Sequence, residues 1–227
     1  MQPRPRFKIC CIQDAVEADL AVRYGASALG LVAAMPSGPG VIPEPRIAAI
    51  AATIPPGIAS FLLTSERNPT ALVAQARRCR CNTVQICDRL EDNVFDFLRV
   101  SMPGIALVQV VHVTGEEALA EAERVAPYVN AILLDSGNPK LAVPELGGTG
   151  RRHDWLISAR IRAEVPVPLY LAGGLRADNV AEAIATVGPF AVDVCTGVRT
   201  DGRLDEAKLA AFVAALDTVS AGSRRSP

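Results

Sequence analysis

Short apolar segments alternate with amphipathic segments along the whole chain, and this alternation predicts a repeated strand-helix unit. The short segments are rich in Val, Ile, Leu and Ala, as is typical of parallel strands buried on both faces. The segments between them carry apolar residues at helical spacing. Strands are expected at 7–11, 28–33, 58–63, 83–87, 106–112, 131–135, 167–172 and 191–195, and helices at 15–24, 45–54, 69–79, 89–100, 115–126, 154–164, 179–187 and 205–220.

Eight such repeats with no linker between them predict an α/β fold, a single (β/α)8 barrel domain over residues 1–227. The Gly/Ser-rich residues 221–227 are expected to form a disordered tail. A doubly wound open sheet is the alternative, but it normally has a glycine-rich fingerprint after its first strand, where this chain has Cys10-Cys11-Ile12-Gln13. The segment 136–152 is long for a barrel loop and is predicted to act as a lid.

Composition narrows the classes of protein that the chain can belong to. Half of the residues are hydrophobic, which is enough for a large core, and the formal charge of −1 comes without a basic stripe for nucleic acid. No apolar run is long enough to span a membrane, and the apolar segment after the basic N-terminus is too short for a signal peptide. A cytoplasmic location with six reduced cysteines is therefore expected, and the Cys79-x-Cys81 pair is a weak zinc signature.

Glycine-rich turns follow the seventh and eighth expected strands. Gly173-Gly174 ends one strand and Thr196-Gly197 ends the next. Backbone N–H groups of such loops approach phosphate closely, and this pair of loops is a frequent phosphate site in barrels. The two loops therefore predict phosphate binding, although tight turns alone would also explain the glycines.

A thiol and a carboxyl group stand at two other strand ends. Cys10 ends the first strand and Asp135 ends the sixth, so both are expected at the mouth of the barrel, where barrels carry their chemistry. They can act as a general base and a general acid. The alternatives are a packed cysteine and a carboxylate that caps a helix, which is also the role expected of Asp14 and Asp178.

A second set of residues near the strand ends leaves a metal site open. Thiolates with one imidazole suit zinc. Spacing does not show that these side chains converge, and small apolar packing explains most of them, so no metal is expected. The set is Cys11, Cys87, His112 and Cys195.

Six blocks in the order of the chain resemble one known family, phosphoribosylanthranilate isomerase. They are Lys8-Ile9-Cys10, Val84-Gln85, Leu133-Leu134-Asp135, Gly147-Gly148-Thr149-Gly150 with Asp154-Trp155, Ala172-Gly173-Gly174-Leu175 with Asn179-Val180, and Asp193-Val194 with Gly197-Val198. The resemblance implies a cofactor-free (β/α)8 enzyme of tryptophan biosynthesis that carries out an Amadori rearrangement. Its partner would be a small phosphorylated sugar-amine substrate, and the enzyme would be a monomer or a homodimer.

The resemblance also implies roles for single residues. Asp135 would protonate the furanose ring oxygen, and Cys10 would remove the C2 proton of the opened sugar. The remaining substrate-binding candidates are Lys8, which would neutralise charge or lie between barrel and helices, Gln85, Gly148, Gly173, Gly174, Asp193, Thr196 and Gly197.

Several positions depart from the family's pattern. Cys11 stands where the family usually has Gly, and the segment 37–40 replaces a loop whose arginine contacts the anthranilate carboxylate. The next arginine, Arg46, falls on the following expected helix. Cys87, Gln109 and His153 stand in place of a His, a Lys and a Phe. Three functions therefore remain: the isomerase itself, a paralogue isomerase for another phosphosugar amine, or a non-catalytic barrel that binds a phosphorylated ligand.

Overall fold

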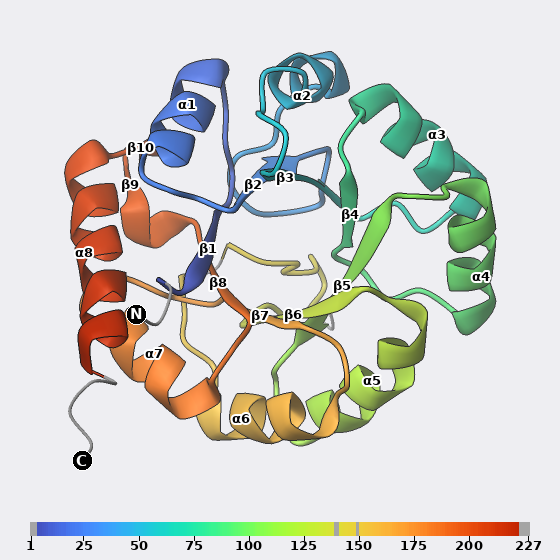
Figure 1. The fold of residues 1–227 in the computed structure, drawn as a ribbon. Coiled ribbons are helices and arrows are strands. Elements are labelled where there is room, and N and C mark those ends of the chain that lie inside the picture. The colour runs from blue at the N-terminus through green and yellow to red at the C-terminus, as the bar shows by residue number, and fades with distance from the viewer. Residues whose placement is uncertain (1–3, 139–140, 149, 223–227) are drawn as a thin grey trace.

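Eight parallel strands close into a barrel, and helices surround it (Figure 1). The computed structural model describes residues 4–138, 141–148 and 150–222. Strands pair in chain order, and β1 (Arg6–Ile9) closes the barrel by pairing with β8 (Ala191–Val194), with Ile9 beside Val194. This closure confirms the predicted barrel and is incompatible with an open sheet, which would leave these two strands apart.

The other elements follow the predicted alternation, with small shifts at their ends. The strands are β2 (Ala28–Val32), β3 (Ala59–Thr64), β4 (Thr83–Ile86), β5 (Ala106–His112), β6 (Ala131–Asp135) and β7 (Leu169–Leu171), with a small hairpin of β9 (Arg199–Thr200) and β10 (Arg203–Leu204). The helices are α1 (Ala15–Arg23), α2 (Glu44–Ala51), α3 (Pro69–Cys79), α4 (Asp92–Ser101), α5 (Glu117–Val125), α6 (Trp155–Glu164), α7 (Val180–Val187) and α8 (Glu206–Gly222), with short 3-10 turns at Ala126–Tyr128 and Thr196–Val198.

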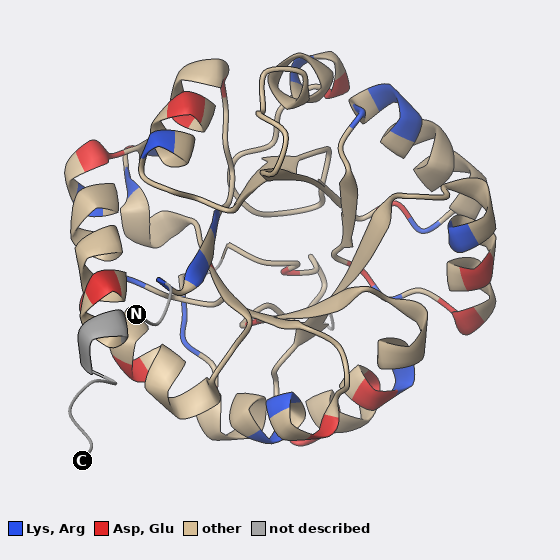
Figure 2. Cartoon of the chain, in the orientation of Figure 1, with Lys and Arg blue, Asp and Glu red and all other residues tan. Residues whose placement is uncertain are grey.

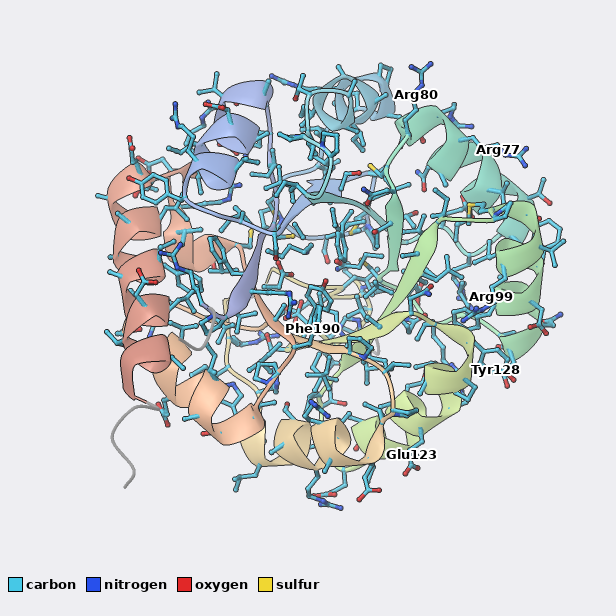
Figure 3. The ribbon with its side chains drawn as sticks, viewed as in Figure 1. Arg77, Arg80, Arg99, Glu123, Tyr128 and Phe190 are labelled. Atoms are coloured by element: carbon cyan, nitrogen blue, oxygen red, sulfur yellow. The ribbon has the colours of Figure 1, made fainter. Side chains whose placement is uncertain are left out.

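The apolar residues of the strands divide into two packed layers. One layer lies between strands and helices, and its buried side chains include Leu29, Leu62 and Phe212. The other fills the interior of the barrel, with Phe61, Val108 and Leu133 among its members. Figure 3 shows side chains across the whole interior, so the barrel is a packed core and not a pore.

Lys, Arg, Asp and Glu residues lie mainly on the surrounding helices, as Figure 2 shows. Arg77 and Arg80 point outward at the edge of the molecule (Figure 3), whereas Arg99 donates to the carbonyl oxygen of Tyr128. Among the described residues, none of the helices is both long and apolar enough to cross a membrane. The few charged groups inside the barrel therefore stand out as functional candidates.

The N-terminal ends of α1 and α7 show whether Asp14 and Asp178 are the helix caps that the sequence predicted. The Asp14 side chain accepts a hydrogen bond from Glu17 N at 2.9 Å, so it caps α1 as predicted. The prediction for Asp178 is wrong, because Asn179 is the cap residue of α7 and the Asp178 carboxylate binds the Arg176 side chain. At the C-terminus, α8 includes the first two residues of the predicted tail, and residues 223–227 lie outside the described part.

Candidate active site

A small cavity lies where the strands end, at the mouth of the barrel. Its volume is about 60 Å³. The residues that line it come from the ends of seven strands and the loops that follow them: Cys10, Cys11, Val32, Met35, Ser37, Gly38, Pro39, Leu63, Gln85, Asp135, Leu146, Gly147, Gly148, Gly150, Ala172, Gly173, Gly174, Leu175, Asp193, Cys195 and Thr196. The cavity therefore combines the predicted acid, base and glycine loops in one place.

Cys10 follows β1 directly and is only 7% exposed. Its backbone N–H donates to Val194 O at 2.9 Å, which continues the β1–β8 pairing past the strand ends. The neighbouring Cys11 thiol donates to Cys10 Sγ at 3.7 Å. This hydrogen bond lowers the pKa of the Cys10 thiol; burial opposes it, and the charge of Lys8 lowers the pKa further. A lowered pKa favours the thiolate form of a cysteine, which is the form that can act as a base.

Asp135 ends β6 on the far side of β7 and β8 from Cys10. Its carboxylate accepts a hydrogen bond from Ser136 N at 2.7 Å. The other oxygen, Oδ2, faces Gly147, where a Cβ atom would lie 2.7 Å from it. Burial raises the pKa of Asp135 to about 6, against the hydrogen bond from Ser136. A carboxyl group with this pKa can hold a proton near neutral pH and release it to a substrate.

The glycine loops after β7 and β8 pack tightly against neighbouring backbone. Gly174 has a φ of 63°, and a Cβ there would lie 2.7 Å from Arg151 C and 2.9 Å from Gly150 O. Only glycine meets both demands without strain. Thr196, at the start of the turn after β8, also lines the cavity. The backbone of both loops therefore comes close to the space where a ligand would lie.

Two buried oxygen atoms at the cavity have no hydrogen-bond partner. They are Gln85 Oε1 and Asp193 Oδ1, on residues that are 3% and 7% exposed. A buried acceptor without a hydrogen bond costs free energy, so most such atoms in proteins accept a hydrogen bond from a protein group, a water molecule or a ligand. Hydroxyl or amine groups of a ligand would supply it.

Comparison with known proteins places this geometry in a family. Residues 59–215 match the family model described as N-(5'phosphoribosyl)anthranilate (PRA) isomerase. The chain belongs to the N-(5'-phosphoribosyl)anthranilate isomerase family. It is 37% identical to the isomerase of that name from Haloferax volcanii over 94% of this chain and 93% of that one. The isomerase from Methanocella arvoryzae is 31% identical over 90% of this chain and 93% of its own.

Solved structures of the isomerase family agree in fold. The phosphoribosyl anthranilate isomerase of Thermotoga maritima superposes with a TM-score of 0.78 at 28% identity, covering 94% of this chain and 99% of that one. Another isomerase structure holds reduced 1-(o-carboxyphenylamino)-1-deoxyribulose 5-phosphate and superposes with a TM-score of 0.76 at 26% identity, covering 94% and 99%.

Two of the predicted substrate-binding residues of this isomerase do not line the cavity. Gly197 lies behind it, where a Cβ would meet Leu175 O at 2.0 Å. Lys8 is fully buried inside the barrel beneath the site, and its Nζ donates to Asp193 Oδ2 at 2.9 Å. The alternative that places Lys8 between barrel and helices is wrong, because its Nζ lies 5.2 Å from the ring of Phe61 in the interior layer.

Removing one member of the Lys8–Asp193 pair is expected to destabilise the fold strongly. Lys8→Met leaves the Asp193 carboxylate buried without its cation, which should lower the free energy of unfolding by about 3–5 kcal/mol. Denaturant unfolding measures this change. Asp19→Ala, which breaks the exposed Asp19–Arg23 pair on α1, is the control and should cost less than about 1 kcal/mol. Equal stability of Lys8→Met and wild type would contradict a structural role for the pair.

The four residues considered for a metal do not come together. Cys11 and Cys195 meet at the cavity, whereas His112 Nε2 faces the carbonyl oxygen of Cys87 at 3.1 Å. Within the described residues, no group of three or more His, Cys, Asp or Glu side chains could hold a metal ion. The Cys87 thiol is buried, and burial raises its pKa to about 12, which disfavours the thiolate form that metals bind.

Of the positions that depart from the family pattern, some line the cavity and others do not. Cys11 and residues 37–39 line it, whereas Arg46, Cys87, Gln109 and His153 do not. Arg46 is exposed on α2. Gln109 donates to backbone carbonyls of Ile86 and Asp88, and His153 Nε2 lies 2.7 Å from Ser158 Oγ. The described residues that line the cavity include no Lys, Arg or His. Their apolar members, such as Met35 and Leu146, form the remaining wall.

Sequence reasoning missed a buried arginine that holds the β1 loop. Arg199 donates to the carbonyl oxygens of Cys10 and Cys11 at 3.0 and 2.7 Å. Its guanidinium also binds the buried carboxylate of Glu17. In the sequence, Arg199 follows the last expected strand and Glu17 lies in the first expected helix, and nothing in these two positions indicates that the side chains meet. The arrangement fixes the backbone that carries both thiols.

Proposed function

We propose that the protein converts N-(5'-phosphoribosyl)anthranilate to 1-(o-carboxyphenylamino)-1-deoxyribulose 5-phosphate, a step of tryptophan biosynthesis. One observation carries the proposal: a thiol with a lowered pKa and a carboxyl group with a raised pKa line one cavity beside two glycine loops. An Amadori rearrangement needs a base, an acid and a fixed phosphate. Membership of the isomerase family supports the same assignment.

The reaction begins with proton transfer from Asp135 to the ring oxygen of the furanose. As the C1–O bond breaks, the lone pair of the aryl nitrogen forms a C1=N bond and the sugar opens to an iminium ion. The Cys10 thiolate then removes the proton from C2, and the C–H electrons form a C1=C2 bond. The resulting enolamine tautomerises to the C2 ketone and gains a proton at C1. A single acid and a single base therefore suffice, and the proposed step uses no cofactor.

The rest of the substrate matches the other features of the cavity. Backbone N–H groups of the loops at Gly173-Gly174 and Thr196 would bind the phosphate. The unpaired oxygens of Gln85 and Asp193 would accept hydrogen bonds from sugar hydroxyls or the aryl amine. The aromatic ring would pack on the apolar wall of Met35 and Leu146. Its carboxylate has no cationic partner on the described lining residues, so activity on this aglycone is the decisive test.

Substrate entry is proposed to require movement of the loop after β6. The cavity of about 60 Å³ is far smaller than typical ligand pockets, which hold roughly 300–1,000 Å³. Gly148 lies against Pro39 of the loop after β2, where a Cβ would meet Pro39 Cδ at 2.5 Å. Separation of these two residues would open the site. The predicted lid 136–152 includes residues 139, 140 and 149, which lie outside the described part.

A methyl group at Gly174 is expected to weaken phosphate binding. The Cβ of Gly174→Ala would strike the 150–151 backbone and displace the loop, so the KM should rise about tenfold, the equivalent of 1.4 kcal/mol of binding. Gly188→Ala is a matched control, because Gly188 has nearly the same φ of 61° and a Cβ there would meet nothing within 4 Å. Steady-state kinetics and inhibition by inorganic phosphate measure the effect, and equal KM values for the two variants would argue against this phosphate site.

The test of the proposed reaction is a steady-state assay with phosphoribosylanthranilate generated in situ. Consumption of the substrate is followed by the loss of its anthranilate fluorescence. Turnover by the wild type establishes the reaction. A well-folded protein without turnover would reject it and favour a paralogue or a phospholigand-binding barrel.

The cellular setting is part of the same proposal. A biosynthetic isomerase of this kind would work in the cytoplasm. A related isomerase from Thermotoga maritima, 25% identical with a TM-score of 0.76 over 94% of this chain, is described as dimeric, with monomers generated from it. We propose that this protein is a monomer or a homodimer.

A further inference from the structure

Three cysteine thiols meet at the end of β1 and β8. The Cys195 thiol donates to Cys11 Sγ at 2.9 Å, and the Cys11 thiol donates to Cys10 Sγ at 3.7 Å. Cys10 and Cys11 are buried, whereas Cys195 is half-buried and reached from the cavity. Cys195, the most accessible of the three thiols, is therefore connected to the proposed catalytic base, Cys10, through Cys11.

The positions of their sulfurs place Cys11 and Cys195 within reach of a disulfide bond. The two residues follow the ends of β1 and β8, which are paired neighbours in the barrel. The sulfurs, at 2.9 Å, need to approach by less than 1 Å to reach the bond length of about 2.05 Å. Arg199 holds the backbone of Cys11 on the β8 side through its carbonyl oxygen.

The backbone conformation of Cys11 directs its side chain toward Cys195. Its φ of 64° lies in the left-handed region, which turns its side chain toward Cys195 rather than along the strand. Gly40 gives it room, because a Cβ at Gly40 would lie 2.5 Å from Cys11 Cβ. Pro39 O, at 3.5 Å, is the other acceptor near the Cys11 thiol. The loop after β2 is thus fitted around this thiol.

We propose that Cys11 and Cys195 form a dithiol that a peroxide oxidises to a disulfide, and that this disulfide removes the hydrogen bond on which the Cys10 thiolate depends. The peroxide first takes two electrons from the accessible Cys195 sulfur; its O–O bond breaks, giving Cys195–SOH and water. The Cys11 sulfur then attacks the Cys195 sulfur, the S–S bond forms and the S–O bond breaks. The departing hydroxide takes the Cys11 proton and leaves as a second water.

The consequence for Cys10 follows from the hydrogen bonds. A disulfide sulfur has no S–H group, so Cys11 stops donating to Cys10 Sγ. The pKa of Cys10 then rises, because this bond is the largest of the influences that lower it. Cys11 is therefore a positioning residue in the reduced enzyme. The effect on activity rests on the proposed function, whereas formation of the disulfide does not.

The disulfide is tested on the full chain without reference to activity. The protein is treated with hydrogen peroxide, remaining thiols are alkylated, and tryptic peptides are analysed by mass spectrometry. The peptide 9–23 should become linked to the peptide 177–199. Cys10→Ala should retain this cross-link and Cys11→Gly, which suits the positive φ, should lose it. Absence of the cross-link in Cys10→Ala would overturn the proposal, and Cys81→Ala is the control at a remote buried thiol.

The coupling to Cys10 is tested by comparing oxidised and reduced samples of each variant. The kcat/KM of the wild type at neutral pH should fall about tenfold or more as the cross-link forms, equivalent to one unit in the pKa of Cys10, and should return with dithiothreitol. Cys195→Ser should keep most of its own activity under the same treatment. Equal losses in the wild type and Cys195→Ser would overturn the coupling, since direct oxidation of Cys10 would then explain both. A wild type without turnover but with the cross-link refutes only the proposed function.

Discussion

Cys10→Ala is expected to abolish most turnover of phosphoribosylanthranilate while leaving the fold intact. Removing a general base typically costs about 10²- to 10⁴-fold in rate. The fall should be in kcat and in kcat/KM alike, because the base acts on the C2 proton in the transition state and contributes little to substrate binding. Steady-state kinetics by anthranilate fluorescence measure both constants.

Two further variants separate loss of the base from loss of packing. Cys81→Ala removes another buried thiol, in the layer between strands and helices, and should keep wild-type kinetics. Cys10→Ser keeps a side chain of similar shape but has a hydroxyl that does not ionise near neutral pH, so it should be as inactive as Cys10→Ala. Wild-type turnover by Cys10→Ser would show that the thiolate is not the base.

The strand ends were the best guide to the site that the sequence offered. Because parallel strands of a barrel all end at one face, Cys10 and Asp135 could be placed together although 125 positions separate them. The glycine loop at Gly173-Gly174 was predictable for the same reason. These features depend only on position along each strand, which hydrophobic periodicity reports well.

The sequence did not predict those side-chain contacts that join residues on different strands of the barrel. Lys8 could be assigned to either face from alternation alone, and its counter-charge Asp193 is distant in the chain. The contact between Cys11 and Cys195 depends on a left-handed φ at Cys11. This conformation could not be predicted from the sequence, because cysteine rarely adopts it. His112 was considered with Cys87 as part of a metal site, and it approaches Cys87 through the backbone oxygen rather than the sulfur.

Asp135→Asn is expected to lower kcat/KM by about 10²- to 10⁴-fold, because the amide cannot deliver a proton to the ring oxygen. The loss should depend on pH in a direction fixed by the pKa of Asp135, which burial raises to about 6. The protonated form is the active one for an acid, so its contribution is complete below this value and declines as the pH rises through it. The ratio of wild-type to Asp135→Asn kcat/KM cancels the ionisation of Cys10, which both proteins share. This ratio should be independent of pH at low pH and should fall about tenfold for each pH unit well above pH 6. A ratio that stays constant across this range would assign the proton to another donor. The ratio can change with pH only through a group that titrates in the wild type and is missing from the variant.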